Sequence, residues 1–182
     1  MRKYLKENEL KALLEAPENL RDHLILRVLY VTGMRVGELC ALRVGDVDLD
    51  EEAITIQRAK RHKEGRMVPI PDRSTKMLLN QQMLGRGKKE PLFPSQKGGF
   101  LSTRQVERLV YRYAKEVGID EDKRHPHVLR HTHAVMALRS GIDLRTLQLN
   151  LGHSSINTTA IYLTMDIEER SRQYREHALP AL

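Results

Sequence analysis

The stretch PHVLRHTHAVMALRS at residues 126–140 decides the fold, because it has the pattern of a helix buried along one side. Pro126 suits a first helical turn, where its missing N–H leaves no hydrogen bond unmade. At 100° per residue, one side of this helix carries an apolar stripe, formed by Val128, Leu129, Val135 and Met136. Such a stripe predicts a helix that packs against the core of a domain.

Polar groups lie on the same helix away from the apolar stripe. His127 and Arg130 share a face, and only Ala134, whose side chain is small enough for a ligand to approach, lies between them. A guanidinium placed in this way can bind two phosphate oxygens at once. His131 falls beside Val135, so we expect it to pack in the core.

A cluster of histidines offers an alternative chemistry for this region, with side chains at positions 125, 127, 131 and 133. His127 and His131 have the i, i+4 spacing of a metal-binding pair. However, the Glu of an H-E-x-x-H motif is absent, and the cation of Arg130 would weaken metal binding. The pattern therefore favours a phosphate ligand over a metal. We expect His133 to be exposed or a minor partner.

Helical and strand patterns extend outward from this segment. Apolar spacing and capping residues predict helices at 7–15, 20–32, 72–84, 102–117 and 143–152. Shorter helical stretches are expected after Gly33 and around Tyr162, with a last amphipathic helix at 166–178. Alternating, β-branched residues predict strands at 47–49, 53–57 and 66–70. The sequence thus predicts a mainly α domain with one small antiparallel β-sheet, an α+β fold spanning 1–182.

Composition narrows the class of protein. The 182 residues include 31 Lys and Arg against 24 Asp and Glu, a net charge of +7, which favours a polyanionic partner such as nucleic acid. No apolar run reaches the ~18 residues that span a bilayer. The start MRKYLKENEL lacks the apolar core of a signal peptide, so we expect a cytoplasmic protein without membrane partners. Cys40 is the only cysteine, which excludes an intrachain disulfide.

Two further segments carry candidate phosphate ligands, TGMRVGEL at 32–39 and AKRHKEGR at 59–66. Arg35 follows a helix-ending glycine and precedes a new helix, where free N–H groups favour an anion. A solvated surface arginine is an equal alternative. Lys60 and Lys63 lie in a basic hairpin turn, which is either a solvated tip or a loop that places an ammonium group on DNA.

The segment LGHSSINTTAIY at 151–162 completes the set. His153 follows a tight turn at Gly152 with little bulk, so its imidazole can approach a ligand closely. Nothing in the spacing of Tyr162 alone distinguishes it from Tyr30, Tyr111 or Tyr113.

In their order and spacing, TG-x-R-x-x-EL, H-x-L-R-H, LGHS and a terminal IY resemble the tyrosine recombinase (phage integrase) family, including its Xer-like members. The resemblance covers essentially the whole chain. It implies a tyrosine recombinase/type IB topoisomerase-like catalytic domain that cleaves and rejoins DNA through a covalent 3′-phosphotyrosyl intermediate. Family members usually carry an additional DNA-binding domain, and we expect no separate N-terminal domain in residues 1–182 because the chain starts almost directly on the catalytic domain. An excised fragment and a naturally minimal enzyme are the two alternatives.

The resemblance also implies roles for six catalytic residues. Arg35, Arg130 and His153 would bind the non-bridging phosphate oxygens, and His127 would accept a proton or orient the nucleophile. Lys60 would protonate the leaving 5′-oxygen, with Lys63 as a substitute because the hairpin has one extra residue. Tyr162 would be the nucleophile. No metal, cofactor or small-molecule substrate is implied.

The implied partners are double-stranded DNA and further copies of the chain. A tetramer would exchange strands at specific sites, with helix 166–178 docked on a neighbouring subunit. Packing of that helix on its own domain is an equal alternative. Type IB topoisomerase-like nicking and closing would use the same residues, whereas a non-enzymatic DNA-binding module would need neither Tyr162 nor Lys60.

Overall fold

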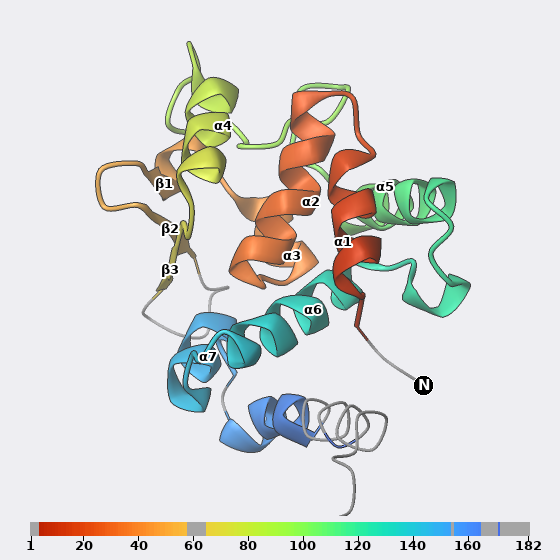
Figure 1. The fold of residues 1–182 in the computed structure, drawn as a ribbon. Helices are drawn as coiled ribbons and strands as arrows, with labels where there is room; N and C mark the ends of the chain where they lie inside the picture. The colour runs from red at the N-terminus through yellow and green to blue at the C-terminus, as the bar shows by residue number, and fades with distance from the viewer. Residues whose placement is uncertain (1–3, 58–64, 154, 165–170, 172–182) are drawn as a thin grey trace, which may run out of the picture.

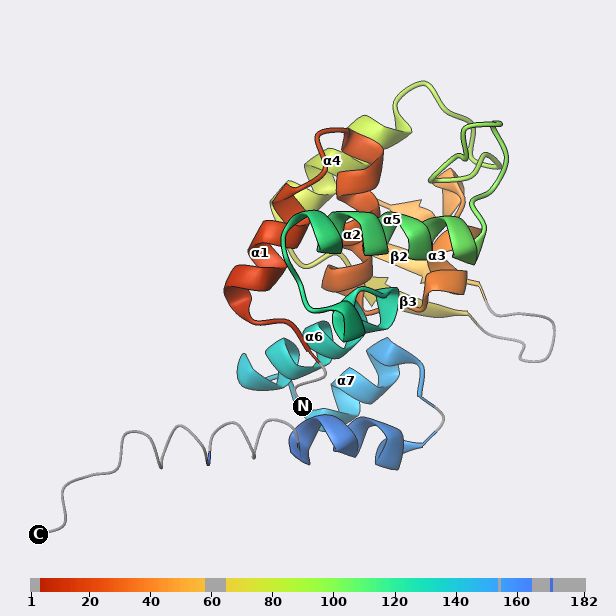
Figure 2. The ribbon, with the colours of Figure 1, turned by 90° about the vertical axis from the view of Figure 1, so that its right-hand side faces the viewer.

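The computed structural model describes residues 4–57, 65–153, 155–164 and 171 (Figures 1 and 2). Its helices are α1 (Glu7–Glu15), α2 (Leu20–Thr32), α3 (Val36–Ala41), α4 (Arg73–Met83), α5 (Thr103–Glu116), α6 (Pro126–Arg139) and α7 (Leu144–Leu151). Residues 156–164 form another helix. The strands are β1 (Val47–Asp48), β2 (Ala53–Ile56) and β3 (Arg66–Pro69). The mainly helical fold with one small sheet is confirmed. Two short 3-10 helices, Val44–Asp46 and Glu121–Lys123, were not predicted.

Local chemistry sets the ends of the helices that carry the site. The side chain of Asn19 accepts a hydrogen bond at the start of α2, and Gly33, in the left-handed conformation (φ 61°), ends it. The side chain of Asp143 accepts two backbone N–H groups at the start of α7, and Gly152 (φ 64°) ends it. The predicted bounds rested on Gly33, Asp143 and Gly152, whereas the cap at Asn19 was not predicted.

The sheet is antiparallel in the order β1-β2-β3. Ile54 of β2 pairs with Val47 on one side and with Val68 on the other. The segment predicted as a basic hairpin turn follows β2 and precedes β3 in the sequence. Lys60 and Lys63 lie outside the described residues, as does the predicted helix at 166–178 except for Ser171.

Helix α6 joins two hydrophobic clusters. Val128 and Leu129, in its first half, belong to the main core, which α1 to α5 and the sheet complete. Its second half contributes to a smaller cluster made by Tyr4, Ala134, Val135, Ala137, Leu138, Leu147, Leu151 and Tyr162. In Figure 1, α6 runs between the main body of the domain and the layer formed by α7 and residues 156–164.

The second cluster corrects the predicted faces of α6. Arg130 and Ala134 were expected on a face open to a ligand, but both are buried, with Arg130 only 4% exposed. The prediction assumed that only the apolar stripe of α6 is buried. In the structure, α7 and the helix at 156–164 also cover the opposite side of α6. Val128, Leu129 and Val135 are buried as predicted, whereas Met136 is half-buried.

Gly33 lies where the end of α2 meets α6 and α7. A Cβ added to it would lie 2.5 Å from Cδ2 of His133 and 2.8 Å from a methyl group of Leu151. His133 is half-buried there, and its ring meets that of Tyr30 edge-on. Of the two expectations for His133, exposure is therefore wrong. Only glycine permits this approach in a left-handed conformation.

We predict that Gly33→Ala destabilises the fold more than Gly118→Ala. Both glycines have positive φ, but nothing lies within 4 Å of a Cβ added to Gly118. The backbone conformation alone costs about 1–2 kcal/mol. Displacing His133 and Leu151 adds about 1–3 kcal/mol. Urea unfolding of both variants measures the difference, and equal losses would show that the contact at Gly33 does not constrain the fold.

Candidate functional site

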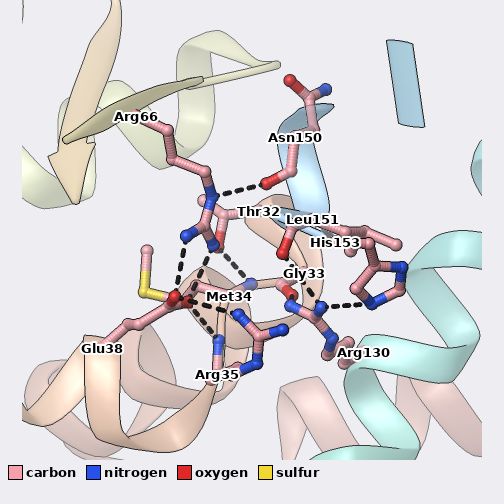
Figure 3. A network of polar contacts seen from close by, with 10 residues as sticks. All are labelled: Thr32, Gly33, Met34, Arg35, Glu38, Arg66, Arg130, Asn150, Leu151 and His153. Carbon is pink, nitrogen blue, oxygen red and sulfur yellow. Dashed lines mark hydrogen bonds and ion pairs between the residues drawn. The ribbon is translucent and has the colours of Figure 1, made fainter. Parts of the chain in front are cut away.

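Arg130 is the centre of the site. Its Nη1 donates to the carbonyl of Gly33 (2.6 Å), and its Nη2 donates to the carbonyl of Leu151 (2.9 Å) and to Nε2 of His153 (2.7 Å) (Figure 3). Within the described residues these partners are all uncharged. Burial, with the nearby charge of Arg35, lowers the pKa of the guanidinium to about 10, so it remains charged at neutral pH. A buried cation held by neutral groups is suited to an anionic ligand.

Arg35 precedes α3, with its side chain 45% exposed. Its backbone N–H donates to Oε2 of Glu38 (2.7 Å), and its Nη1 lies 3.3 Å from Oε1. Glu38 also receives two hydrogen bonds from Arg66 of β3, at 2.7 and 2.8 Å. Burial by itself would raise the pKa of Glu38, but these arginines hold it below its usual value. Arg35 and Arg66 thus share one carboxylate, and Arg130 adds a third guanidinium, which leaves this group of residues positive.

His153 lies in the turn after α7. Gln148 of α7 fixes this turn, because its carbonyl accepts from the N–H of His153 (3.2 Å) and its side chain donates to the His153 carbonyl (3.1 Å). Arg130 can only donate, so Nε2 of His153 is the acceptor and Nδ1 carries the proton toward Oγ1 of Thr159 (2.9 Å). Burial and the charge of Arg130 lower the pKa of His153 to about 4, and the ring is neutral.

Tyr162 is buried in the helix at 156–164, only 4% exposed. Its hydroxyl lies 3.1 Å from Nδ1 of His131. Its ring stacks nearly parallel to that of His153, with centroids 6.4 Å apart. Burial raises the pKa of the phenol, and the positive charges of Arg130 and Arg35 offset this only in part. The phenol is therefore protonated at neutral pH and needs a base before it can act as a nucleophile.

Two residues at the site were missed by sequence reasoning. His131 was expected to pack in the core, but it contacts the hydroxyl of Tyr162. The i, i+4 spacing from His127 was a usable signal, since it places both rings on one side of α6, 6.2 Å apart. Thr159 was not considered, although it precedes Tyr162 by one helical turn and so shares its face.

The structure brings together five of the six predicted residues. Arg130, His153 and Tyr162 adjoin one another, and the positive charge of Arg35 acts on all three. His127 lies one turn before His131 with its side chain largely exposed. Partial loss of hydration, together with nearby positive charges, lowers its pKa. Lys60 lies outside the described residues. In the part of the chain that the structure describes, no three possible metal ligands converge, and no helix has the length and hydropathy of a membrane span.

We predict that His153 titrates far below the usual histidine range of about 6.5, with a midpoint of about 4. Between about pH 4 and 6.5 the ring of His153 binds a proton in the unfolded chain but not in the folded one. The neutral ring therefore adds to the free energy of unfolding in full above about pH 6.5, and this addition is lost as the pH falls toward 4. NMR titration of the imidazole protons measures the midpoint, and His153→Asn should reduce the acid loss of unfolding free energy. A midpoint near 6.5 would contradict the burial of the ring.

Comparison with known proteins identifies the family to which this chain is similar. The model of the phage integrase family matches residues 3–169. The tyrosine recombinase XerC of Thermodesulfovibrio yellowstonii is 40% identical, over 97% of this chain and 63% of its own length. The tyrosine recombinase XerD of Yersinia pestis is 35% identical, over 96% of this chain and 62% of its own. The chain thus spans somewhat less than two thirds of these relatives.

Solved structures share the fold. The XerA recombinase superposes with a TM-score of 0.81 at 36% identity, covering 98% of this chain and 64% of its own. The XerH site-specific recombinase, in a pre-cleavage complex with its difH substrate, gives 0.74 at 27% identity, covering 93% and 52%. The expected tyrosine recombinase-type catalytic fold is confirmed. The chain therefore belongs to the phage integrase family.

Proposed function

We propose that this chain is the catalytic domain of a site-specific DNA recombinase, which cleaves and rejoins duplex DNA through a 3′-phosphotyrosyl bond to Tyr162. One observation carries the proposal: the guanidinium of Arg130, buried among uncharged groups, lies with that of Arg35 beside a buried phenol. A DNA phosphodiester supplies a negative charge that both cations can bind, and its phosphorus is the electrophile that a tyrosine can attack.

In the proposed cleavage step, the Tyr162 oxygen forms a bond to phosphorus while the bond from phosphorus to the 5′-oxygen breaks. Arg35 and Arg130 bind the non-bridging oxygens, where negative charge grows in the transition state. Protonation of His153 on binding the phosphate would make its Nε2 a third donor. Lys60, or Lys63 in its place, gives a proton to the leaving 5′-oxygen. The reverse steps join a new 5′-hydroxyl to the same phosphorus, with no metal or cofactor.

The proton of the phenol has two candidate acceptors on α6. His127 was expected to accept it or to orient the nucleophile, but Nδ1 of His131 is the nitrogen in hydrogen-bond contact with the hydroxyl. We therefore assign the proton to His131 and a phosphate contact to the exposed His127. General-base catalysis of this kind contributes about 10²–10⁴-fold in rate.

Further copies of the chain are part of the proposal. Strand exchange needs paired sites, so we propose a tetramer on DNA, with helix 166–178 as the docking element, acting in the cytoplasm where its DNA lies. Recombinase relatives favour strand exchange over nicking and closing alone. A non-enzymatic DNA-binding module would have no need for the contacts that surround Tyr162.

We predict that the chain forms a denaturation-resistant adduct with a nicked duplex that carries its recognition site, and that Tyr162→Phe forms none. Arg130→Lys keeps the charge but loses the planar fork, so adduct formation should slow by about 10²–10³-fold. Gel mobility after denaturation measures the adduct, and peptide mapping locates it. An adduct that persists in Tyr162→Phe would mean another nucleophile.

The same assay separates the two histidines. His131→Ala should slow adduct formation more than His127→Ala, because only His131 contacts the hydroxyl. DNA affinity is the control and should be nearly unchanged in both variants. Equal losses would contradict the assignment to His131, and a larger loss in His127→Ala would return the proton to His127. EDTA should leave the rate unchanged, whereas inhibition would revive the metal alternative.

A further inference from the structure

Arg66, the first residue of β3, contacts two of the segments that build the site. Its side chain is 13% exposed. Both terminal nitrogens donate to Glu38 of α3, at 2.7 and 2.8 Å, and Nε donates to the carbonyl of Asn150 in α7 (2.9 Å) (Figure 3). Arg66 has no role in the proposed cleavage step, and it was noted in the sequence only as part of a charge run.

Glu38 contacts two arginine side chains, and its contacts to Arg66 are shorter and more numerous than those to the Arg35 guanidinium. Arg66 occupies both carboxylate oxygens, whereas the guanidinium of Arg35 makes one contact to Glu38, at 3.3 Å. The stronger hold on Arg35 is through its backbone N–H, which donates to Oε2 at 2.7 Å. Glu38 therefore fixes the backbone of Arg35, while most donors of the Arg35 guanidinium stay available to a ligand.

The position of Arg66 is itself fixed from the side of α7. Besides the bond to Asn150, its guanidinium lies against Gly152, where an added Cβ would be 2.8 Å from Nη1. Lysine has one terminal nitrogen and no Nε donor, so it cannot occupy both oxygens of Glu38 and the Asn150 carbonyl in this geometry. A planar fork with a third donor is required.

We propose that Arg66 is a positioning residue for Arg35, and the proposal rests on the proposed function. By occupying the carboxylate of Glu38, Arg66 prevents Glu38 from binding the Arg35 guanidinium at both oxygens. Without Arg66, the half-buried carboxylate of Glu38 would be left with Arg35 as its neighbouring cation, and the two would form a bidentate ion pair. That pair would compete with the DNA phosphate for Arg35.

A suppressor experiment tests this competition. Arg66→Ala should slow adduct formation at saturating DNA by about 10²-fold, the scale of a misplaced catalytic group. Adding Glu38→Gln should restore at least tenfold of that loss, because glutamine still accepts from the Arg35 N–H but carries no charge to trap the guanidinium. A role limited to stability predicts the opposite, since the second change removes one more interaction.

Two further variants serve as controls. Arg27→Ala breaks a comparable ion pair to Asp72 (2.9 Å) between α2 and α4, so it should lower stability without slowing adduct formation. Arg66→Lys keeps a positive charge and replaces Arg66→Ala in the test if Arg66→Ala does not fold. It should be slowed less than Arg66→Ala and should also be rescued by Glu38→Gln. Wild-type rates in Arg66→Ala and Arg66→Lys, or no rescue in either background, would overturn the proposal.

A crystal structure of Arg66→Ala, or of Arg66→Lys if the first does not fold, decides the geometry without any DNA chemistry. We expect both Arg35 terminal nitrogens within about 3 Å of the Glu38 oxygens. An Arg35 guanidinium that keeps its single long contact would overturn the proposal even if the rates fall. If the wild type forms no adduct, the proposed function fails, while this structure still tests the competition for Glu38.

Discussion

The burial of one charged group, the guanidinium of Arg130, constrains the rest of the site. Removing a guanidinium from water is costly unless its donors are satisfied. Two main-chain carbonyls and one imidazole, from the turns that end α2 and α7, accept from three of its five N–H groups here. Both turns depend on left-handed glycines, Gly33 and Gly152, so the backbone is shaped to meet the cation. Since these partners are neutral, the positive charge itself is left for a phosphate.

Helix α6 transmits this constraint between the two hydrophobic clusters. Its first half lies in the main core, which is built from most of the helices and the sheet, and its second half lies in the smaller cluster that contains Tyr162. Arg130 and His131 lie between the two halves. The proposed nucleophile, Tyr162, thus lies in the smaller cluster, and Arg130 is held from both sides, by the carbonyl of Gly33 at the end of α2 and by Leu151 and His153 at the end of α7. Relative placement of the two clusters sets the geometry of the reaction.

The sequence was sufficient for the parts of the structure that local chemistry determines. Helix ends followed from residues such as Gly33 and Asp143, and the small sheet from alternation around Ile54. The burial of Arg130 could not be predicted in this way, because the residues that cover it come from distant parts of the chain. The face opposite the apolar stripe of α6 therefore looked open to solvent.

Contacts between side chains were also beyond a reading of spacing. His131 has the same position relative to the apolar stripe whether it packs in a core or binds a hydroxyl, and only the placement of Tyr162 decides between them. Arg66 differs from its basic neighbours in the hairpin only through its contacts to Glu38 and Asn150. Family motifs identified Arg35, His127, Arg130, His153 and Tyr162 as a set, but not what holds them.

A crystal structure of Tyr162→Phe bound to an uncleaved duplex with its recognition site tests the central claim most directly. The account predicts one backbone phosphate with non-bridging oxygens within about 3 Å of the Arg35 and Arg130 guanidinium groups, and with the substituted aromatic ring next to its phosphorus. The account would be contradicted by a structure in which the duplex is bound but every phosphate is remote from Arg130. The hydrogen bonds of Arg130 would then be the same as without DNA.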